Sequence, residues 1–176
     1  FSHPIERLVL IDAAVDGAQQ LKAGVRSGTK AIVLDPQRDG IEQISHILAG
    51  YKGKGLDSIS IVAHGQPGGV QLGSAKLGEQ TLPAYRERLR QWRQALADDA
   101  AILLYSCQVA AGELGRQFVG QLHEIAGVAI AASSTLVGSD RKGGNWDLDV
   151  RSGEIACPEV FTDGTLAAYP GILPTF

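Results

Sequence analysis

The sequence predicts an α/β domain with three layers, in which helices cover both faces of a mostly parallel, doubly wound sheet. Two observations carry this prediction. Short continuous apolar runs recur along the 176-residue chain, and segments with the spacing of amphipathic helices lie between most of them. Such runs are typical of parallel strands buried on both faces, and right-handed crossovers between them give a doubly wound sheet.

Five apolar runs are expected to form the strands of this sheet. Each run is followed directly by a polar residue, and together they cover residues 8–11, 31–34, 59–63, 100–105 and 128–132. Open α/β sheets form their binding and catalytic sites beyond the carboxyl ends of their strands. The polar residues that follow the runs are therefore the first candidates for a functional site.

Helical spacing occupies most of the chain between these runs. The pattern is weak over residues 18–25 and clear over residues 41–51. Two longer apolar stripes predict helices over residues 82–96 and 114–125, each with a stripe wide enough to pack on a sheet. The last stripe begins with Leu114, which we therefore expect to face the core.

Two glycine-rich stretches interrupt the alternation and predict small β-hairpin additions. They cover residues 68–78 and residues 144–156, the second with its turn at Arg151-Ser152-Gly153. The length fits one domain with a sizeable core. We expect residues 1–169 to form that domain and residues 170–176 to form a linker or tail toward a following domain.

Charge and composition exclude several classes of function. The net charge is −3 without a dominant basic patch, so we expect no nucleic-acid partner, because such binding depends on Lys and Arg at phosphates. No apolar run approaches the ~20 residues of a membrane span. The two cysteines, Cys107 and Cys157, do not make a disulfide framework. A single bridge between them stays open, and a reduced Cys107 is the preferred interpretation.

The motifs of several other enzyme classes are absent from the sequence. There is no G-x-S-x-G nucleophile elbow, no P-loop and no G-x-G-x-x-G after the first apolar run, which argues against an ordinary α/β-hydrolase and against nucleotide binding. Histidines and cysteines do not occur at metal-ligand spacing. We therefore expect neither a metal nor another cofactor.

Two residues with catalytic chemistry follow two of the apolar runs. His64 follows residues 59–63, and Cys107 follows residues 100–105 after one serine. Neighbouring strands lie about 4.8 Å apart, so side chains at their ends can reach one another. A Cys nucleophile needs a nearby base, which His supplies near neutral pH. We predict a His–Cys dyad with the backbone N–H groups of Gly65 and Cys107 as oxyanion donors.

Each of these residues alone has an ordinary structural explanation. A buried Cys at a strand end is more often a small core residue than a nucleophile, and a His-Gly pair is common at turns. The prediction depends on finding both motifs at the ends of two strands of one sheet.

The two motifs together resemble the signature of the caspase-like (clan CD) cysteine peptidases. In that family one hydrophobic strand ends in His-Gly and a later one ends in a small residue and Cys, as in SIVAHG and LLYSC here. The resemblance implies a caspase-like sheet, a cysteine endopeptidase activity, a dyad of His64 and Cys107, and Gly65 as part of the oxyanion hole.

A second resemblance covers nearly the whole chain. The segments VLID, HGQPGGVQLG, LLYSCQVAAGELGRQFV, AASSTLVG and GGNWDLDV are similar to domain of unknown function 4347. This bacterial domain occurs in very large secreted or surface proteins with cadherin-like, Ig-like or RTX repeats. This resemblance implies a secreted or cell-surface location within a larger adhesin-like protein. The peptide partner follows instead from the peptidase resemblance, and it is a segment of the parent chain if the domain processes its own protein.

Asp12 ends the first apolar run and is a candidate orienter of His64. A doubly wound sheet of this type places the first strand beside the third, and a third residue orients the His in some caspase-like enzymes. The alternative is that Asp12 caps the following turn or helix, a position that Asp favours.

The segment after the fifth run supplies candidates for substrate binding. In caspase-like enzymes this region helps to build the pocket for the residue before the cleaved bond, which carries over here to Ser133, Ser134 and Asp140. Asp140 in such a pocket would favour a basic side chain, although a solvated loop is the preferred interpretation. Trp146 either walls the same cleft or packs beneath the second hairpin.

Three arginines, Arg86, Arg90 and Arg93, share one face of a predicted helix. Some toxin-associated protease domains related to the caspase-like family bind an inositol-phosphate activator through basic residues, whereas a solvated helix face is the simpler explanation here. The leading hypothesis is thus a cysteine endopeptidase. The alternative is a catalytically inactive peptidase-like binding or structural module of a bacterial surface protein.

Overall fold

The computed structural model describes residues 5–155 and 160–173. Six strands form the main sheet, in the order β2-β1-β3-β7-β8-β9. The strands are β1 (Arg7–Asp12), β2 (Thr29–Leu34), β3 (Leu56–Val62), β7 (Leu96–Tyr105), β8 (Ala129–Ala132) and β9 (Val150–Arg151). All neighbours pair in parallel except β9, which runs antiparallel to β8.

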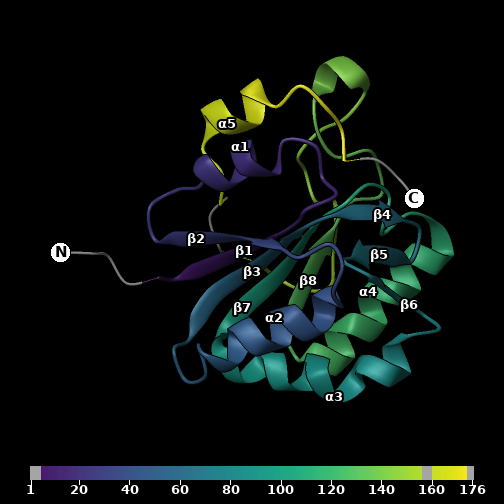
Figure 1. The fold of residues 1–176 in the computed structure, drawn as a ribbon. Helices are drawn as coiled ribbons and strands as arrows, with labels where there is room; N and C mark the ends of the chain where they lie inside the picture. The colour runs from purple at the N-terminus through teal and green to yellow at the C-terminus, as the bar shows by residue number, and fades with distance from the viewer. Residues whose placement is uncertain (1–4, 156–159, 174–176) are drawn as a thin grey trace.

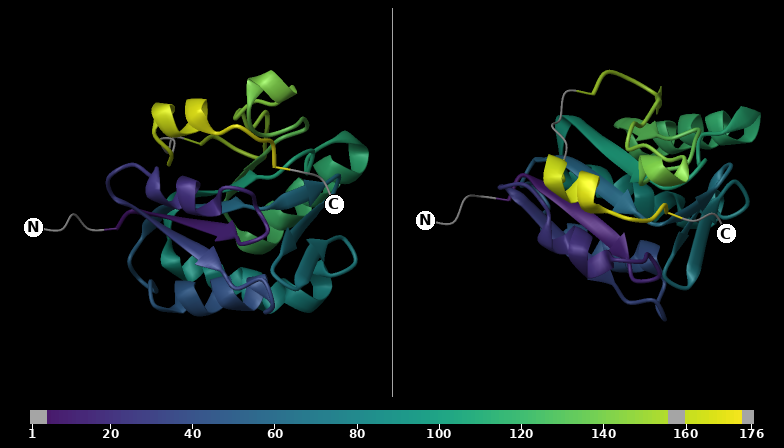
Figure 2. Two further views of the ribbon diagram at one scale, coloured as in Figure 1. Left: turned by 45° about the horizontal axis from the view of Figure 1, so that its top comes forward. Right: turned by 90° about the horizontal axis from the view of Figure 1, so that it is seen from above.

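Helices cover both faces of this sheet, so the predicted three-layer α/β fold is confirmed (Figure 1). One face carries α2 (Gly40–Ala49), α3 (Leu82–Trp92) and α4 (Gly112–Ala126). The other carries the short helices α1 (Ala18–Ala23) and α5 (Asp163–Ala168), which lie side by side in Figures 1 and 2.

The continuous apolar character of the strands follows from burial on both faces. In β1, Leu8 and Leu10 belong to the core cluster beneath α2, α3 and α4, whereas Val9 and Ile11 belong to the cluster on the other face. Successive side chains of a strand point to opposite faces, so a strand covered on both sides is apolar at every position.

A second, three-stranded sheet adjoins the carboxyl end of β3. It consists of β4 (His64–Gln66), β5 (Gly69–Leu72) and β6 (Ala75–Gly78), paired in the order β4-β5-β6. The strands β5 and β6 are antiparallel and confirm the hairpin predicted over residues 68–78. His64 therefore stands where the chain leaves one sheet and enters the other.

The hairpin predicted over residues 144–156 is wrong for the part of it that the structure describes, which ends at residue 155. Val150 and Arg151 form β9 and pair with Ala132 and Ala131 of β8. The predicted turn residue Ser152 continues this pairing, because its backbone N–H donates to Ile130 O at 2.9 Å. The segment therefore extends the main sheet by one short antiparallel strand.

Two helix predictions also need correction. The helix predicted over residues 82–96 ends at Trp92, and the 3₁₀ turn η1 (Arg93–Ala95) leads directly into β7. Leu114 is 47% exposed, because it lies in the first turn of α4 beside the backbone of Gly68 and not over the sheet.

The described residues contain no helix that is both long and apolar enough to cross a membrane.

Candidate active site

The His64-Gly65 segment lies directly against the Ser106-Cys107 segment. The strands β3 and β7 that lead into them are neighbours, with Val62 paired to Tyr105, which is the arrangement that the predicted dyad requires. An added Cβ on Gly65 would lie 2.8 Å from the Cys107 carbonyl oxygen and 2.8 Å from Ser106 Cβ. Contacts this short are not tolerated, so the approach of the two segments requires glycine at position 65.

The backbone directly after Cys107 adopts a sparsely populated conformation. Gln108 has φ 60°. Among the described residues, 5–155 and 160–173, it is the one non-glycine residue with a positive φ. Its N–H donates to Thr135 O at 2.9 Å, and the Ala110 N–H donates to Ser133 O at 3.0 Å. The loop after β8 thus holds the turn that carries Cys107, and conformations of this kind cluster at functional sites.

The Cys107 thiol is free and fully buried. Its Sγ accepts a hydrogen bond from the Val137 N–H at 3.2 Å and donates to the Leu173 carbonyl oxygen. Burial raises the pKa of the Cys107 thiol, and the hydrogen bond to Val137 opposes this only in part. The resting thiol is therefore protonated. Cys157, its potential disulfide partner, lies outside the described residues.

The His64 imidazole is half-buried, and its Nε2 atom is buried without a hydrogen-bond partner in the described part of the chain. It is not among the hydrogen-bond partners of Cys107, which are Val137 and Leu173. The structure therefore brings the backbones of the two motifs into contact but does not join the two reactive side chains.

Asp12 lies near His64 at the carboxyl end of β1, which pairs with β3 as expected. Its Oδ1 accepts the Gly73 N–H at 3.1 Å, and its buried Oδ2 has no partner among the described residues. Burial raises the pKa of the Asp12 carboxyl, while the Gly73 N–H, the charge of His64 and the Ala13 amide lower it. The side chain thus ties β1 to the β5–β6 turn instead of capping α1, whose N-cap is Gly17.

The two serines predicted to bind substrate take part in the loop that they occupy. Ser133 is buried, and its Oγ accepts the Thr135 N–H at 3.0 Å. The Ser134 N–H donates to Asp149 Oδ1 at 2.8 Å, and its hydroxyl donates to Asp149 Oδ2. Burial raises the pKa of Asp149, but the hydrogen bonds outweigh burial and hold this pKa below its ordinary value. No motif in the sequence signalled this pairing.

Asp140 and Trp146 line one hollow of about 480 Å³ beside α5. Asp140 lies in η2 (Asp140–Lys142), exposed and followed by Arg141, which also lines the hollow. A positive side chain so close weakens the expected preference for a basic substrate residue. Trp146 walls the hollow and also packs on the rings of Tyr105, Phe161 and Tyr169, with centroids 6.2, 6.3 and 5.6 Å away.

Tyr169 and Leu173 join the site from the last described part of the chain, and no motif in the sequence pointed to either residue. Burial raises the pKa of Tyr169 to about 12, and the electrostatic influence of Asp16 and Cys107 acts in the same direction. Its hydroxyl donates to the Asp16 carbonyl at 2.6 Å. The chain returns from α5 toward the end of the sheet at which β1 and β3 finish (Figure 2).

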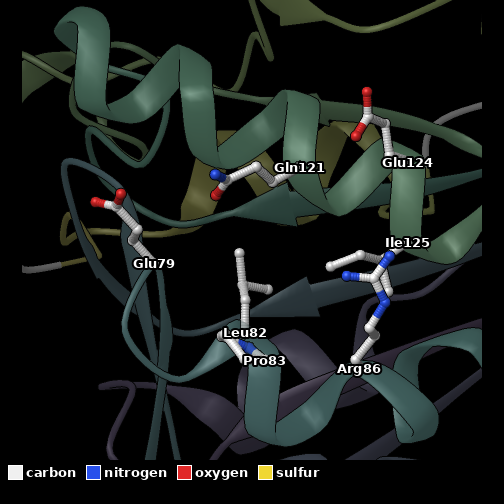
Figure 3. A pocket seen from close by; sticks show the side chains of 7 residues that line it. All are labelled: Glu79, Leu82, Pro83, Arg86, Gln121, Glu124 and Ile125. Carbon is white, nitrogen blue, oxygen red and sulfur yellow. The ribbon is translucent and has the colours of Figure 1, made fainter.

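The three arginines considered as an anion site are dispersed. Arg90 pairs with Glu87 at 3.4 Å, and Arg93 pairs with Asp98 at 2.7 Å. Arg86 lines a hollow of about 260 Å³ between α3 and α4, whose other charged residues are Glu79 and Glu124 (Figure 3). Both charge signs meet there, so the hollow does not favour a highly charged anion.

The described residues also contain no group of three or more His, Cys, Asp or Glu side chains able to hold a metal ion.

We predict that Gly65→Ala destabilises the domain by ~1–3 kcal/mol, because the new methyl group overlaps the Cys107 carbonyl and Ser106. Urea unfolding measures the free-energy difference. The matched control is Gly120→Ala in α4, where nothing lies within 4 Å of an added Cβ. Equal stability of the two variants would contradict the close contact at Gly65.

We predict that Asp12→Asn changes how stability depends on pH. The folded pKa of Asp12 is raised, so its contribution to stability is full below the unfolded pKa of ~3.9 and is lost as pH rises through the folded pKa. Asn keeps the acceptor for Gly73 and removes this loss. The free energy of unfolding of the variant relative to wild type should therefore rise above about pH 4 and then level off.

The control for Asp12→Asn is Asp99→Asn, which changes an exposed carboxylate on β7. It should follow the wild-type pH dependence throughout. The interpretation fails if Asp12→Asn also follows the wild-type curve.

The fold is similar to that of a secreted C11 cysteine protease from Bacteroides thetaiotaomicron, solved in complex with an irreversible peptide inhibitor, with a TM-score of 0.45 and 14% sequence identity. The match covers 74% of this chain and 49% of the protease, so the chain spans about half the length of that protein. A likeness of this size carries no argument about chemistry.

Sequence comparison identifies the family. A search of curated proteins gives no match. The family model described as Domain of unknown function (DUF4347) matches residues 8–173, which is nearly the whole chain and confirms the resemblance seen in the sequence. The chain belongs to the DUF4347 family.

Proposed function

We propose that this domain is a cysteine endopeptidase in which Cys107 is the nucleophile and His64 transfers protons. The observation that carries the proposal is the close approach of Gly65 to the Cys107 carbonyl oxygen and to Ser106 Cβ. This contact brings the His64-Gly65 segment at the start of β4 beside the turn that carries Cys107, where β3 and β7 end. The positive φ of Gln108 supports it, because strained backbone is retained where the surrounding structure holds a functional side chain.

The proposed reaction begins with attack of Cys107 Sγ on the carbonyl carbon of an extended peptide. His64 takes up the thiol proton, and the N–H groups of Gly65 and Cys107 stabilise the oxyanion. The peptide C–N bond then breaks, and His64 gives its proton to the leaving amine. Water hydrolyses the resulting thioester, which restores the thiol and releases the carboxylate product.

Asp12 is proposed as a positioning residue for His64. The Asp12 carboxylate and the imidazole each keep one buried polar atom, Oδ2 and Nε2, without a partner among the described residues. An unmade hydrogen bond of this kind costs about 1–3 kcal/mol, so the site favours any ring position that satisfies one of these atoms. Catalytic hydrogen bonds are often long or unmade before substrate binds.

The alternative function is a catalytically inactive, peptidase-like binding or structural module. The burial of Cys107 and its raised thiol pKa favour this alternative, because a nucleophilic cysteine needs access and thiolate character. For either function we propose a secreted or cell-surface location within a larger bacterial adhesin-like protein. For the enzyme, the substrate is a peptide segment of that parent chain, cut by autoprocessing, with no nucleic-acid partner.

We predict that a peptidyl acyloxymethyl ketone labels Cys107 in a manner that depends on His64. Loss of a general base typically reduces rates about 10²–10⁴-fold, so His64→Ala should slow labelling at least ~100-fold. The control is His46→Ala, which changes an exposed histidine of α2 and should label at the wild-type rate. Mass spectrometry of the labelled peptide measures the rate.

The proposal and its alternative give opposite results in this experiment. If His64→Ala and His46→Ala label equally with wild type, the thiol does not depend on His64 and the module without catalysis is favoured. Asp12→Asn should slow labelling less than His64→Ala, because a positioning residue acts only through the imidazole.

A further inference from the structure

The C-terminal segment of the described chain covers the Cys107 thiol. Cys107 is fully buried, and its Sγ donates a hydrogen bond to the carbonyl oxygen of Leu173, a residue 66 positions later. The Leu173 side chain is itself fully buried in the same cluster as Cys107. A peptide carbonyl from the protein's own chain therefore occupies the place beside the thiol.

Backbone pairing of the antiparallel β type holds the covering segment, although neither of the paired segments forms a named strand. The Ser139 N–H donates to Gly171 O at 2.8 Å, and the Leu173 N–H donates to Val137 O at 2.8 Å. Gly138 and Ile172 form an antiparallel bridge between these two bonds. This is the pattern by which extended peptides add to an exposed strand edge, with backbone bonds for affinity and side-chain pockets for selectivity.

Gly138 makes the close approach of this strand feasible. It has φ +136°, and an added Cβ would lie 2.5 Å from Gly171 O and 2.6 Å from Ile172 Cα. Any larger residue at position 138 would push the covering segment away. Upstream, the Tyr169 hydroxyl bonds to the Asp16 carbonyl, so the segment is anchored immediately before it reaches Cys107.

We propose that Gly171–Leu173 is a resident peptide occupant of the site, and that it has to leave before a substrate peptide reaches Cys107. This inference rests on the proposed function, because residues 137–139 are the place where a substrate peptide binds only if the domain is a peptidase. The ligand class is an extended peptide with an aliphatic residue at the place of Leu173. That residue contributes an N–H to Val137 O and a carbonyl to the thiol.

The test measures alkylation of Cys107 by iodoacetamide, with Cys157→Ser in every variant so that one thiol reports. Deletion of residues 170–176 removes the occupant, and deletion of residues 174–176 is the matched control that keeps Leu173. We expect the larger deletion to alkylate at least ~10-fold faster than the full chain and the control to match the full chain, because modification follows the population of the uncovered state.

A second variant protects the test against unfolding of the deletion. Leu173→Ala in the full chain keeps the backbone and shortens the buried side chain, so it should also alkylate faster while far-UV circular dichroism stays unchanged. If either folded variant, the deletion or Leu173→Ala, alkylates at the full-chain rate, the segment is not the cover and the inference is overturned.

A peptide added in trans tests the ligand class. Acetyl-Pro-Gly-Ile-Leu-amide, which copies residues 170–173, should restore slow alkylation to the folded larger deletion in a concentration-dependent way. The same peptide with an N-methyl group on the Leu nitrogen lacks the N–H that Val137 O accepts and should not protect. Equal protection by both peptides, or by neither, contradicts strand addition at this edge.

The same measurements with His64→Ala separate this inference from the proposed function. Covering by Gly171–Leu173 does not involve the imidazole, so the ratio of alkylation rates between the larger deletion and the full chain should be unchanged. The ratio of alkylation rates can stay unchanged while His64→Ala labels with the peptidyl probe at the wild-type rate. This pair of results would reject the peptidase and support the resident occupant. If the larger deletion no longer alkylates faster than the full chain in the His64→Ala background, the proposal that Gly171–Leu173 covers Cys107 is rejected.

Discussion

The close approach of Gly65 to the Cys107 carbonyl oxygen and to Ser106 Cβ is the constraint on which the site depends. It requires that β3 and β7 be neighbours, that both end at the same edge, and that position 65 carry no side chain. The second sheet begins at His64, so the chain passes from the parallel sheet to the small antiparallel sheet at this contact. The loop after β8 braces the other side by hydrogen bonds to Gln108 and Ala110, which fixes the turn that holds the thiol.

Much of the fold was predictable because local pattern and tertiary structure agree. Continuous apolar runs such as Leu8 to Ile11 reflect burial on two faces, and this property is visible residue by residue. The predictions that failed depend on partners distant in sequence. Val150 and Arg151 pair with β8 instead of folding back on their own segment, and Leu114 rests beside Gly68. Neither of these contacts produces a periodic pattern of apolar residues in the sequence.

The candidate site divides in the same way. The positions of His64, Gly65, Cys107 and Asp12 at strand ends could be predicted because strand ends are recognisable in the sequence. Their catalytic roles stay predictions. The cover over the thiol was not found, because it consists of backbone hydrogen bonds between residues 137–139 and residues 171–173. Backbone groups are the same in every residue, so composition carries no trace of them. The tail expected to be a linker from residue 170 is packed on this domain as far as Leu173, and where a following domain begins stays a prediction.

Burial raises the pKa of the Cys107 thiol and shields it, which opposes the proposed catalysis, whereas the positive φ of Gln108 beside it supports the proposal. A covered nucleophile reconciles the two, because displacement of Leu173 exposes the thiol without disturbing the Gly65 contact. A crystal structure of the domain bearing a covalent peptidyl adduct tests this most directly. We expect a bond from Cys107 Sγ to the peptide, the peptide along residues 137–139 in place of Gly171–Leu173, and the peptide oxygen facing the Gly65 N–H. An adduct absent from Cys107, or formed with Gly171–Leu173 still in place, would contradict it.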